Sequence, residues 1–151
     1  METGYLIGDV MNQTVHTIDV GATAQEAAKK MTEVKVGSLV VLHENKPVSI
    51  ITEQDIARKV VGAGLNAKET TVNHIMADTL HLTEPHLDIY HASVKMNQEK
   101  IKHLPVIKES NLLGMISFKD IIQIQPSFIE MIHFNTAKKM ENVENPEFVE
   151  D

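Results

Sequence analysis

The chain has 151 residues, of which 42% are apolar, and this is sufficient for one compact domain with a buried core. Its 14 Lys and Arg residues against 21 Asp and Glu residues give a formal net charge of -7, which argues against nucleic acid or an anionic membrane as a partner. The sequence has no Cys, which excludes disulfides, Cys-ligated zinc and thiol catalysis, and its apolar runs are too short for membrane insertion. We therefore expect a soluble cytoplasmic protein.

The first half of the chain predicts five elements in the order β-α-β-β-α. An extended stretch at 15–18 precedes a helix that Thr23 begins through a capping box with Glu26, and the inner face of this helix is apolar. Two apolar strands at 38–42 and 48–51 are joined by a short polar turn and predict a hairpin. The closing helix begins after Thr52 and ends at Gly62.

The second half repeats the first without gaps. Residues 7–59 align with residues 72–124 at a constant offset of 65, and 13 of the 53 aligned pairs are identical, whereas ordinary composition gives about three. The matching elements are a stretch at 80–83, a helix begun by Asp88, strands at 104–107 and 113–116, and a helix that begins after Ser117 and stops at Pro126. Each copy alone is too small to bury its surface well, so we expect one pseudo-symmetric α+β fold in which the copies pack face to face.

The repeat divides the chain into four parts. Repeat 1 covers residues 7–62, a linker covers 63–71, repeat 2 covers 72–125 and a C-terminal extension covers 126–151. Residues 140–151 are acidic and polar and predict a disordered tail. The apolar residues before them predict a helix that caps the pair, mediates dimerisation or docks a partner; they are Phe128, Ile129, Met131, Ile132 and Phe134.

The most informative chemistry is a hydroxyl followed three residues later by an acid, once in each repeat. The two pairs are Thr52 with Asp55 and Ser117 with Asp120. A hydroxyl between a strand and a helix presents O–H and backbone N–H groups to an anion, and an ionised acid can accept two hydrogen bonds from a ribose diol. The same spacing is an ordinary helix cap, and the two interpretations are compatible.

Five segments carry a resemblance to a known family. They are Val-Met-Asn-Gln-Thr-Val at 10–15, Ile-Ile-Thr-Glu-Gln-Asp at 50–55, Ile-Met-Ala-Asp-Thr-Leu at 75–80, His-Leu-Pro-Val-Ile at 103–107 and Gly-Met-Ile-Ser-Phe-Lys-Asp at 114–120. By their order, spacing and duplication, residues 7 to about 125 resemble a tandem pair of cystathionine-β-synthase (CBS) domains, a Bateman module. The resemblance implies a sandwich-like α+β fold and a regulatory homodimer shaped as a disk. It also implies AMP, ADP, ATP or S-adenosylmethionine as the ligand in clefts between the repeats, so the duplicated hydroxyl-acid pairs favour ligand binding.

The resemblance further implies which residues contact such a ligand. The first extended stretch lies beside the adenine, the residue two before each hydroxyl packs on the ring, and residues just before the second strand meet phosphates. Lys102 and His103 occupy this last place in repeat 2, so we hypothesise that their cleft is the better nucleotide site. Repeat 1 departs from the family pattern at Val40 and Ser49, which makes its cleft the weaker expectation. The expected binding residues are Val15, His16, Ser38, Ile50, Thr52, Asp55, Leu80, His81, Ile101, Lys102, His103, Met115, Ser117 and Asp120.

No catalytic or phosphate-loop motif stands out, and the eight His residues show no standard metal-ligand spacing. We therefore expect a sensor that is not an enzyme, has no catalytic cofactor or metal, and signals to an unknown regulated protein by a conformational shift. Two alternatives stay open: a ligand-free oligomerisation or protein-interaction module, and a hydrolase of the bound nucleotide. The few basic residues near the clefts, Arg58, Lys102 and Lys119, favour a ligand with few phosphates.

Overall fold

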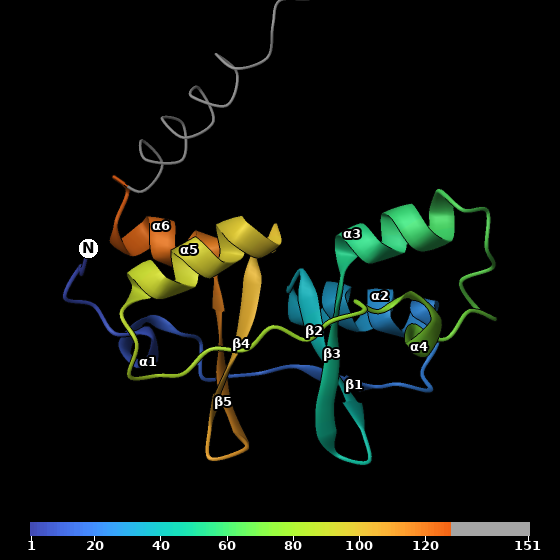
Figure 1. Cartoon of the computed structure of the whole chain (residues 1–151). Coiled ribbons are helices and arrows are strands. Elements are labelled where there is room, and N and C mark those ends of the chain that lie inside the picture. The colour runs from blue at the N-terminus through green and yellow to red at the C-terminus, as the bar shows by residue number, and fades with distance from the viewer. Residues whose placement is uncertain (128–151) are drawn as a thin grey trace, which may run out of the picture.

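A computed structural model of the chain describes residues 1–127, in which the two repeats lie side by side (Figure 1). Repeat 1 contains β1 (Thr17–Asp19), α2 (Ala24–Val34), β2 (Ser38–His43), β3 (Lys46–Thr52), α3 (Glu53–Ile56) and the π-helical turn η1 (Ala57–Val61). Repeat 2 contains α5 (Ile89–Glu99), β4 (His103–Lys108), β5 (Asn111–Ser117) and α6 (Phe118–Ile124). Two short helices, α1 (Ile7–Val10) and α4 (Val72–Ile75), are the first elements of repeat 1 and repeat 2, respectively. This mixture of helices and strands confirms the α+β class.

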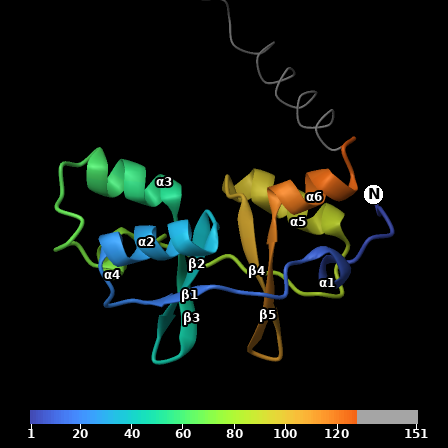
Figure 2. The ribbon, with the colours of Figure 1, turned by 180° about the vertical axis from the view of Figure 1, so that it is seen from behind.

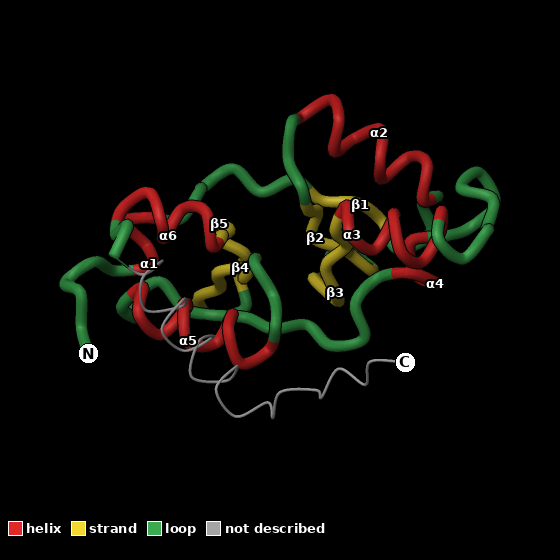
Figure 3. Tube along the Cα trace, turned by 90° about the horizontal axis from the view of Figure 1, so that it is seen from above, coloured by secondary structure: helices red, strands yellow, loops and turns green. Residues whose placement is uncertain are grey.

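Seen from above, the elements form two groups, one with β1, β2 and β3 and the other with β4 and β5 (Figure 3). Strand β2 pairs with β1 in parallel and with β3 in antiparallel orientation, and β4 pairs with β5 in antiparallel orientation. Among residues 1–127, no helix combines the length and the apolar character needed to cross a membrane. The helix and acidic tail expected beyond residue 127 lie outside the described residues.

The local sequence signals form the caps that they predict. Thr23 and Glu26 make the reciprocal capping box of α2, with hydrogen bonds of 2.8 and 3.1 Å. The Asp88 carboxylate begins α5 by accepting a hydrogen bond from the Tyr90 N–H at 2.8 Å. Because these contacts join residues two or three positions apart, the sequence spacing alone was sufficient to predict them.

The turns of the two hairpins are equally regular. The turn pairs are Glu44 with Asn45 and Glu109 with Ser110, and all four residues have positive φ values between 50° and 66°. Two consecutive positive φ values are typical of type I′ turns, whose twist matches that of the flanking strands. The hairpins therefore have the same geometry, and both turns point to the same side of the molecule (Figure 1).

Repeat 2 differs from the prediction in its first strand. In repeat 1, the Val40 N–H donates to the His16 carbonyl at 3.1 Å, which holds β1 against β2. The matching residue in repeat 2 is Pro105, which has no N–H and cannot hold the chain at His81 in this way. The expected stretch at 80–83 therefore joins β4 only through Thr83, and the second sheet has two strands.

The first segments of the two repeats are exchanged. Helix α1 begins repeat 1 but packs on repeat 2, where the Ile7 N–H donates to Leu87 O at 2.8 Å. Helix α4 begins repeat 2 but packs on repeat 1, where the Val72 N–H donates to Ala22 O at 2.8 Å. Figure 2 shows α1 on the side of β5 and α5, and α4 on the side of α2.

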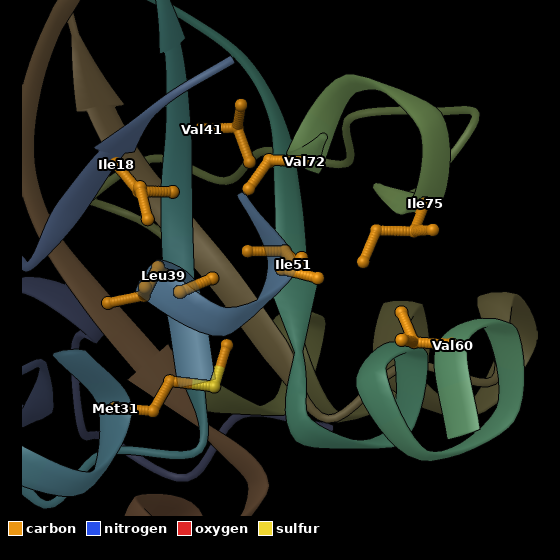
Figure 4. Packing of buried hydrophobic residues seen from close by; sticks show 10 residues of the cluster. Ile18, Met31, Leu39, Val41, Ile51, Val60, Val72 and Ile75 are labelled. Carbon is orange, nitrogen blue, oxygen red and sulfur yellow. The ribbon is translucent and has the colours of Figure 1, made fainter. Parts of the chain in front are cut away.

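Each of the two cores therefore contains residues from both halves of the sequence. In the first core, Val72 and Ile75 of α4 pack with a cluster of repeat 1 that includes Leu39 and Ile51 (Figure 4). In the second, Ile7 is fully buried with residues of α5, α6, β4 and β5. Burial of these side chains in the opposite half stabilises the pair as one unit, because neither core is complete without the exchanged helix.

Candidate functional site

Two clefts lie between the repeats and correspond to each other by the repeat offset. Cleft A has a volume of about 820 Å³ and is bordered by Val15 and His16 of repeat 1 and by Ser117 and Asp120 of repeat 2. Cleft B has a volume of about 650 Å³ and is bordered by Thr52 and Asp55 of repeat 1 and by Thr79 and His81 of repeat 2. Both volumes are in the range of small-molecule sites in proteins.

Each cleft combines the first segment of one repeat with the hydroxyl-acid pair of the other. This crossing follows from the exchange of α1 and α4, because the chain after each exchanged helix must return across the boundary between the repeats. Of the expected binding residues, cleft A brings together Val15, His16, Ser38, Lys102, His103, Met115, Ser117 and Asp120. Cleft B brings together Ile50, Thr52, Asp55, His81, Ile101, Lys102 and His103.

Three of the expected residues lie differently from what the sequence suggested. Leu80 borders neither cleft, since Pro105 leaves its stretch of chain outside the sheet. Lys102 and His103 border both clefts, so their presence does not distinguish one cleft from the other.

The hydroxyl-acid pairs form reciprocal capping boxes, as the helix-cap interpretation predicts. Asp55 N–H donates to the Thr52 hydroxyl at 3.2 Å and Thr52 N–H donates to Asp55 Oδ2 at 2.9 Å. The corresponding distances for Ser117 and Asp120 are 3.1 and 2.8 Å. The caps use one carboxylate oxygen of each acid and the third backbone N–H of each helix.

The first backbone N–H of each of these helices is also occupied. Glu53 N–H donates to Gly37 O at 3.0 Å, and Phe118 N–H donates to Lys102 O at 2.8 Å. Within residues 1–127, this leaves only the second N–H of each helix start, on Gln54 and Lys119, without an acceptor. An anion at the start of α6 therefore meets the Lys119 N–H and the Ser117 hydroxyl, whereas at the start of α3 the Thr52 hydroxyl already donates to Asp55 Oδ2 at 3.1 Å. Both helix starts offer fewer donors than the sequence suggested.

The two acids differ in their second carboxylate oxygen. Asp55 Oδ1 is paired with the Lys59 ammonium at 3.1 Å. The residue of repeat 2 that matches Lys59 is Ile124, which has no charge. Among the described residues, Asp120 has hydrogen bonds only within its cap and makes no ion pair. The Asp120 side chain thus keeps one oxygen for a ligand in cleft A.

In each cleft, the wall formed by the first segment of one repeat is hydrogen-bonded to the other repeat, and the bonds differ between the two clefts. In cleft A, Asn12 and Met115 exchange two backbone hydrogen bonds of 2.9 Å beside Gly114, where a Cβ would lie only 2.6 Å from Asn12 O. In cleft B, the matching residue is Ser49, whose buried hydroxyl donates to Ala77 O at 2.6 Å. One backbone hydrogen bond, from Ala77 N–H to Ile50 O at 3.1 Å, completes this wall. The Ser side chain therefore replaces one backbone contact of the other repeat.

His103 lies close to charged residues that border the two clefts. Burial lowers the pKa of His103 below its ordinary value of 6.5, and the Lys102 charge acts in the same direction, whereas Asp120 and Glu53 oppose it. The lowered pKa favours the neutral form of the imidazole at pH 7. No group of three or more acidic or His side chains within residues 1–127 is arranged to hold a metal ion.

Sequence reasoning missed several residues that border the clefts. They include Thr14 and Lys35 in cleft A, with their matches Thr79 and Lys100 in cleft B, and Glu53 in both. Thr14 with Thr79 and Lys35 with Lys100 are identical pairs of the repeat, so identity between the copies was a signal that could have found them. The lysines also end α2 and α5 with φ values of 57° and 55°.

Comparison with known proteins identifies relatives of the whole described region. The sequence profile of the CBS domain matches residues 7–62 and 72–127. An uncharacterized protein of Methanopyrus kandleri is 32% identical over 139 residues, which are 91% of this chain and 71% of that protein. A protein with CBS domains from Burkholderia ambifaria, described as a signal-transduction protein, has a TM-score of 0.77 at 27% identity and covers 81% of this chain and 95% of its own.

Two further solved structures are similar. A hexameric CBS-CP12 protein from bloom-forming cyanobacteria has a TM-score of 0.74 at 36% identity, with 83% of this chain and 73% of that chain covered. A CBS domain pair in complex with 5′-methylthioadenosine and S-adenosyl-L-methionine has a TM-score of 0.73 at 24% identity, with 80% of this chain and 94% of that chain covered.

Proposed function

This chain belongs to the CBS domain family, and we propose that it is a regulatory module that binds an adenosine-containing ligand with few phosphates between its repeats. Proteins with a CBS pair are regulatory modules, and AMP, ADP, ATP and S-adenosylmethionine are the ligands to consider. The observation that carries the proposal is the pair of matching clefts, each with a strand-to-helix hydroxyl and an acid facing the other repeat.

Cleft A is the proposed principal site. Asp120 keeps a carboxylate oxygen that can accept from a ribose hydroxyl, whereas Asp55 would first have to leave Lys59. Val15 and Met115 supply apolar surface for the flat base, and Ser117 with the Lys119 N–H can donate to a phosphate. Glu53, which borders this cleft as well, opposes additional negative charge, so a ligand with few phosphates fits best.

The structural neighbour with 5′-methylthioadenosine and S-adenosyl-L-methionine supports only the fold: a CBS pair of this shape has room for an adenosine group. We further propose a homodimer that signals to a separate regulated protein without catalysis of its own; the similar CBS-CP12 protein is a hexamer. The cytoplasmic location expected from the sequence stays a prediction.

Isothermal titration calorimetry with AMP, ADP, ATP and S-adenosylmethionine tests the proposal. We expect at least one ligand to bind, and Asp120→Ala to weaken it by about tenfold or more because a charge-assisted hydrogen bond is lost. Asp55→Ala should have the smaller effect, and Glu33→Ala, at an exposed position of α2 outside both clefts, should have none. Each variant should first give the circular dichroism spectrum of the parent protein.

Three outcomes would contradict the proposal in different ways. Absence of heat with all four ligands would favour a ligand-free assembly module. Loss of binding in Asp55→Ala but not in Asp120→Ala would move the principal site to cleft B. Slow conversion of the bound nucleotide that depends on either acid, measured by chromatography of the titrated mixture, would indicate the hydrolase that the sequence left open.

A further inference from the structure

The two clefts are not independent, because they share one wall. Gly37, Glu53, Lys102 and His103 border cleft A and cleft B alike. Gly37 and Lys102 occupy matching positions in the repeat, directly before β2 and β4. The shared wall therefore lies at the centre of the pseudo-symmetric pair, where the same segments of the two repeats meet.

Lys102 is the one cation of this shared wall. Every other Lys or Arg that borders the clefts belongs to a single one: Lys35 and Lys119 to cleft A, and Arg58 and Lys100 to cleft B. Perfect symmetry would place a second lysine at position 37, but the chain has Gly there. Lys102 is exposed and, within residues 1–127, its ammonium makes no hydrogen bond or ion pair.

The surroundings of Lys102 allow its ammonium to serve either cleft. Its backbone is held in place, because Lys102 O accepts a hydrogen bond from the Phe118 N–H at 2.8 Å. The ammonium, however, stands at the end of a flexible four-carbon side chain. On the same wall, the Glu53 carboxylate covers Gly37, with its Oε1 3.1 Å from where a Cβ would lie. An anion in either cleft therefore lies near the same negative charge, on Glu53, and the same positive charge, on Lys102.

We propose that cleft A and cleft B bind anionic ligands with negative coupling, because a phosphate in the first occupied cleft takes the Lys102 ammonium away from the second. This inference rests on the proposed function, since it assumes that both clefts admit an adenosine group. The first phosphate also adds negative charge beside Glu53, which disfavours a second anion in the other cleft. A neutral ligand engages neither effect, so adenosine binds the two clefts without this penalty.

The test is calorimetry with AMP and with adenosine at low and at high salt. For AMP at low salt, we expect the second step to be weaker than the first by about tenfold or more, which corresponds to one charge-assisted contact. High salt should reduce this gap, since it screens the exposed ammonium. Adenosine should bind in two steps with no such gap at either salt concentration.

Two variants separate the shared cation from other causes. Lys102→Gln should weaken the first AMP step and bring the two steps closer together. Gly37→Lys supplies the second cation that the repeat lacks, and it should strengthen the second AMP step by about tenfold. The new side chain is tolerable, because a Cβ at Gly37 meets only the flexible Glu53 side chain and its φ is not positive. Lys108→Gln, at an exposed position of β4 outside both clefts, is the control.

The outcomes distinguish this inference from the proposed function. If adenosine and AMP both bind in two steps, and the difference in affinity between the steps is the same for the two ligands, the proposed function stands and the coupling is refuted. The coupling is also refuted if adenosine occupies one cleft only, or if Gly37→Lys leaves the second AMP step unchanged in a folded protein. If neither ligand binds, the proposed function and the inference both fail.

Discussion

Gly114 allows a test of the contact between Asn12 and Met115 in the wall of cleft A. A methyl group at position 114 should break this contact. A Cβ at position 114 would lie 2.6 Å from Asn12 O and 2.7 Å from Met11 Sδ. The first contact is with backbone, which cannot move without breaking the two hydrogen bonds of 2.9 Å between Asn12 and Met115. Since the φ of Gly114 is not positive, Ala is acceptable to the backbone itself, and only this close contact opposes the substitution.

The magnitude follows from the contacts that are lost. Two backbone hydrogen bonds contribute about 0.5 to 1.5 kcal/mol each, and displacement of Met11 from the core of repeat 2 adds to this. We therefore expect Gly114→Ala to lower the free energy of unfolding by about 2 to 3 kcal/mol. For a chain of 151 residues, this corresponds to a decrease in Tm of about 5 to 10 °C.

The measurement is urea unfolding followed by circular dichroism, with Ser49→Gly as the matched change in repeat 1. Ser49→Gly leaves Ala77 O without the hydroxyl that donates to it at 2.6 Å, and should cost about 1 kcal/mol. In the folded Gly114→Ala protein, AMP should bind more weakly, because the chain from Asn12 to His16 borders cleft A. A stability change below about 0.5 kcal/mol for Gly114→Ala would refute the reasoning, since surface substitutions alone reach that value.

Two further predictions concern titratable groups. Asp88 accepts hydrogen bonds of 2.8 to 2.9 Å from Thr3, Gly4 and Tyr90, and although burial raises its pKa, these bonds together hold it below 3.8. Asp88→Asn should therefore destabilise the fold by about 1 to 2 kcal/mol at neutral pH. This difference in unfolding free energy should shrink below about pH 4, as the wild-type carboxylate is protonated. Urea unfolding at both pH values measures the difference, and an unchanged difference would contradict the role given to the Asp88 carboxylate. For His103, the lowered pKa means that the unfolded chain binds the proton first, so stability should fall as the pH decreases below 6.5. His103→Gln should flatten this dependence in the same assay, and an NMR titration that placed the His103 pKa above 6.5 would show that the sign is wrong.

Which features the sequence predicted depends on the range of the contacts that produce them. The capping boxes of Thr23, Thr52 and Ser117 join residues three positions apart, and the hairpin turns join neighbouring strands. Such local signals, together with the constant repeat offset, were sufficient for the order of elements in both halves. The first strand of repeat 2 was wrongly predicted because of Pro105, whose missing N–H matters only to a strand that pairs with it. The short helices α1 and α4 were not predicted.

The binding residues were predictable as types but not as groups. Asp55 and Asp120 occupy matching places in the sequence, and the repeat offset already sets Lys59 against Ile124. Only the structure shows that Lys59 pairs with Asp55. Identity between the repeats, as in Lys35 and Lys100, was the unused signal for additional cleft residues.

By itself, the sequence determined the duplicated β-α-β-β-α order, the helix caps, the turns and the residue types that could contact a ligand, because these depend on spacing along the chain. The tertiary structure decided the exchange of α1 and α4, and with it the crossing of the walls that pairs Val15 with Asp120 in one cleft. It also decided that Lys102 borders both clefts. These features depend on which apolar surfaces bury each other between segments distant in the sequence, such as Ile7 with Ile89 and Val72 with Leu39, and no local pattern specifies that choice.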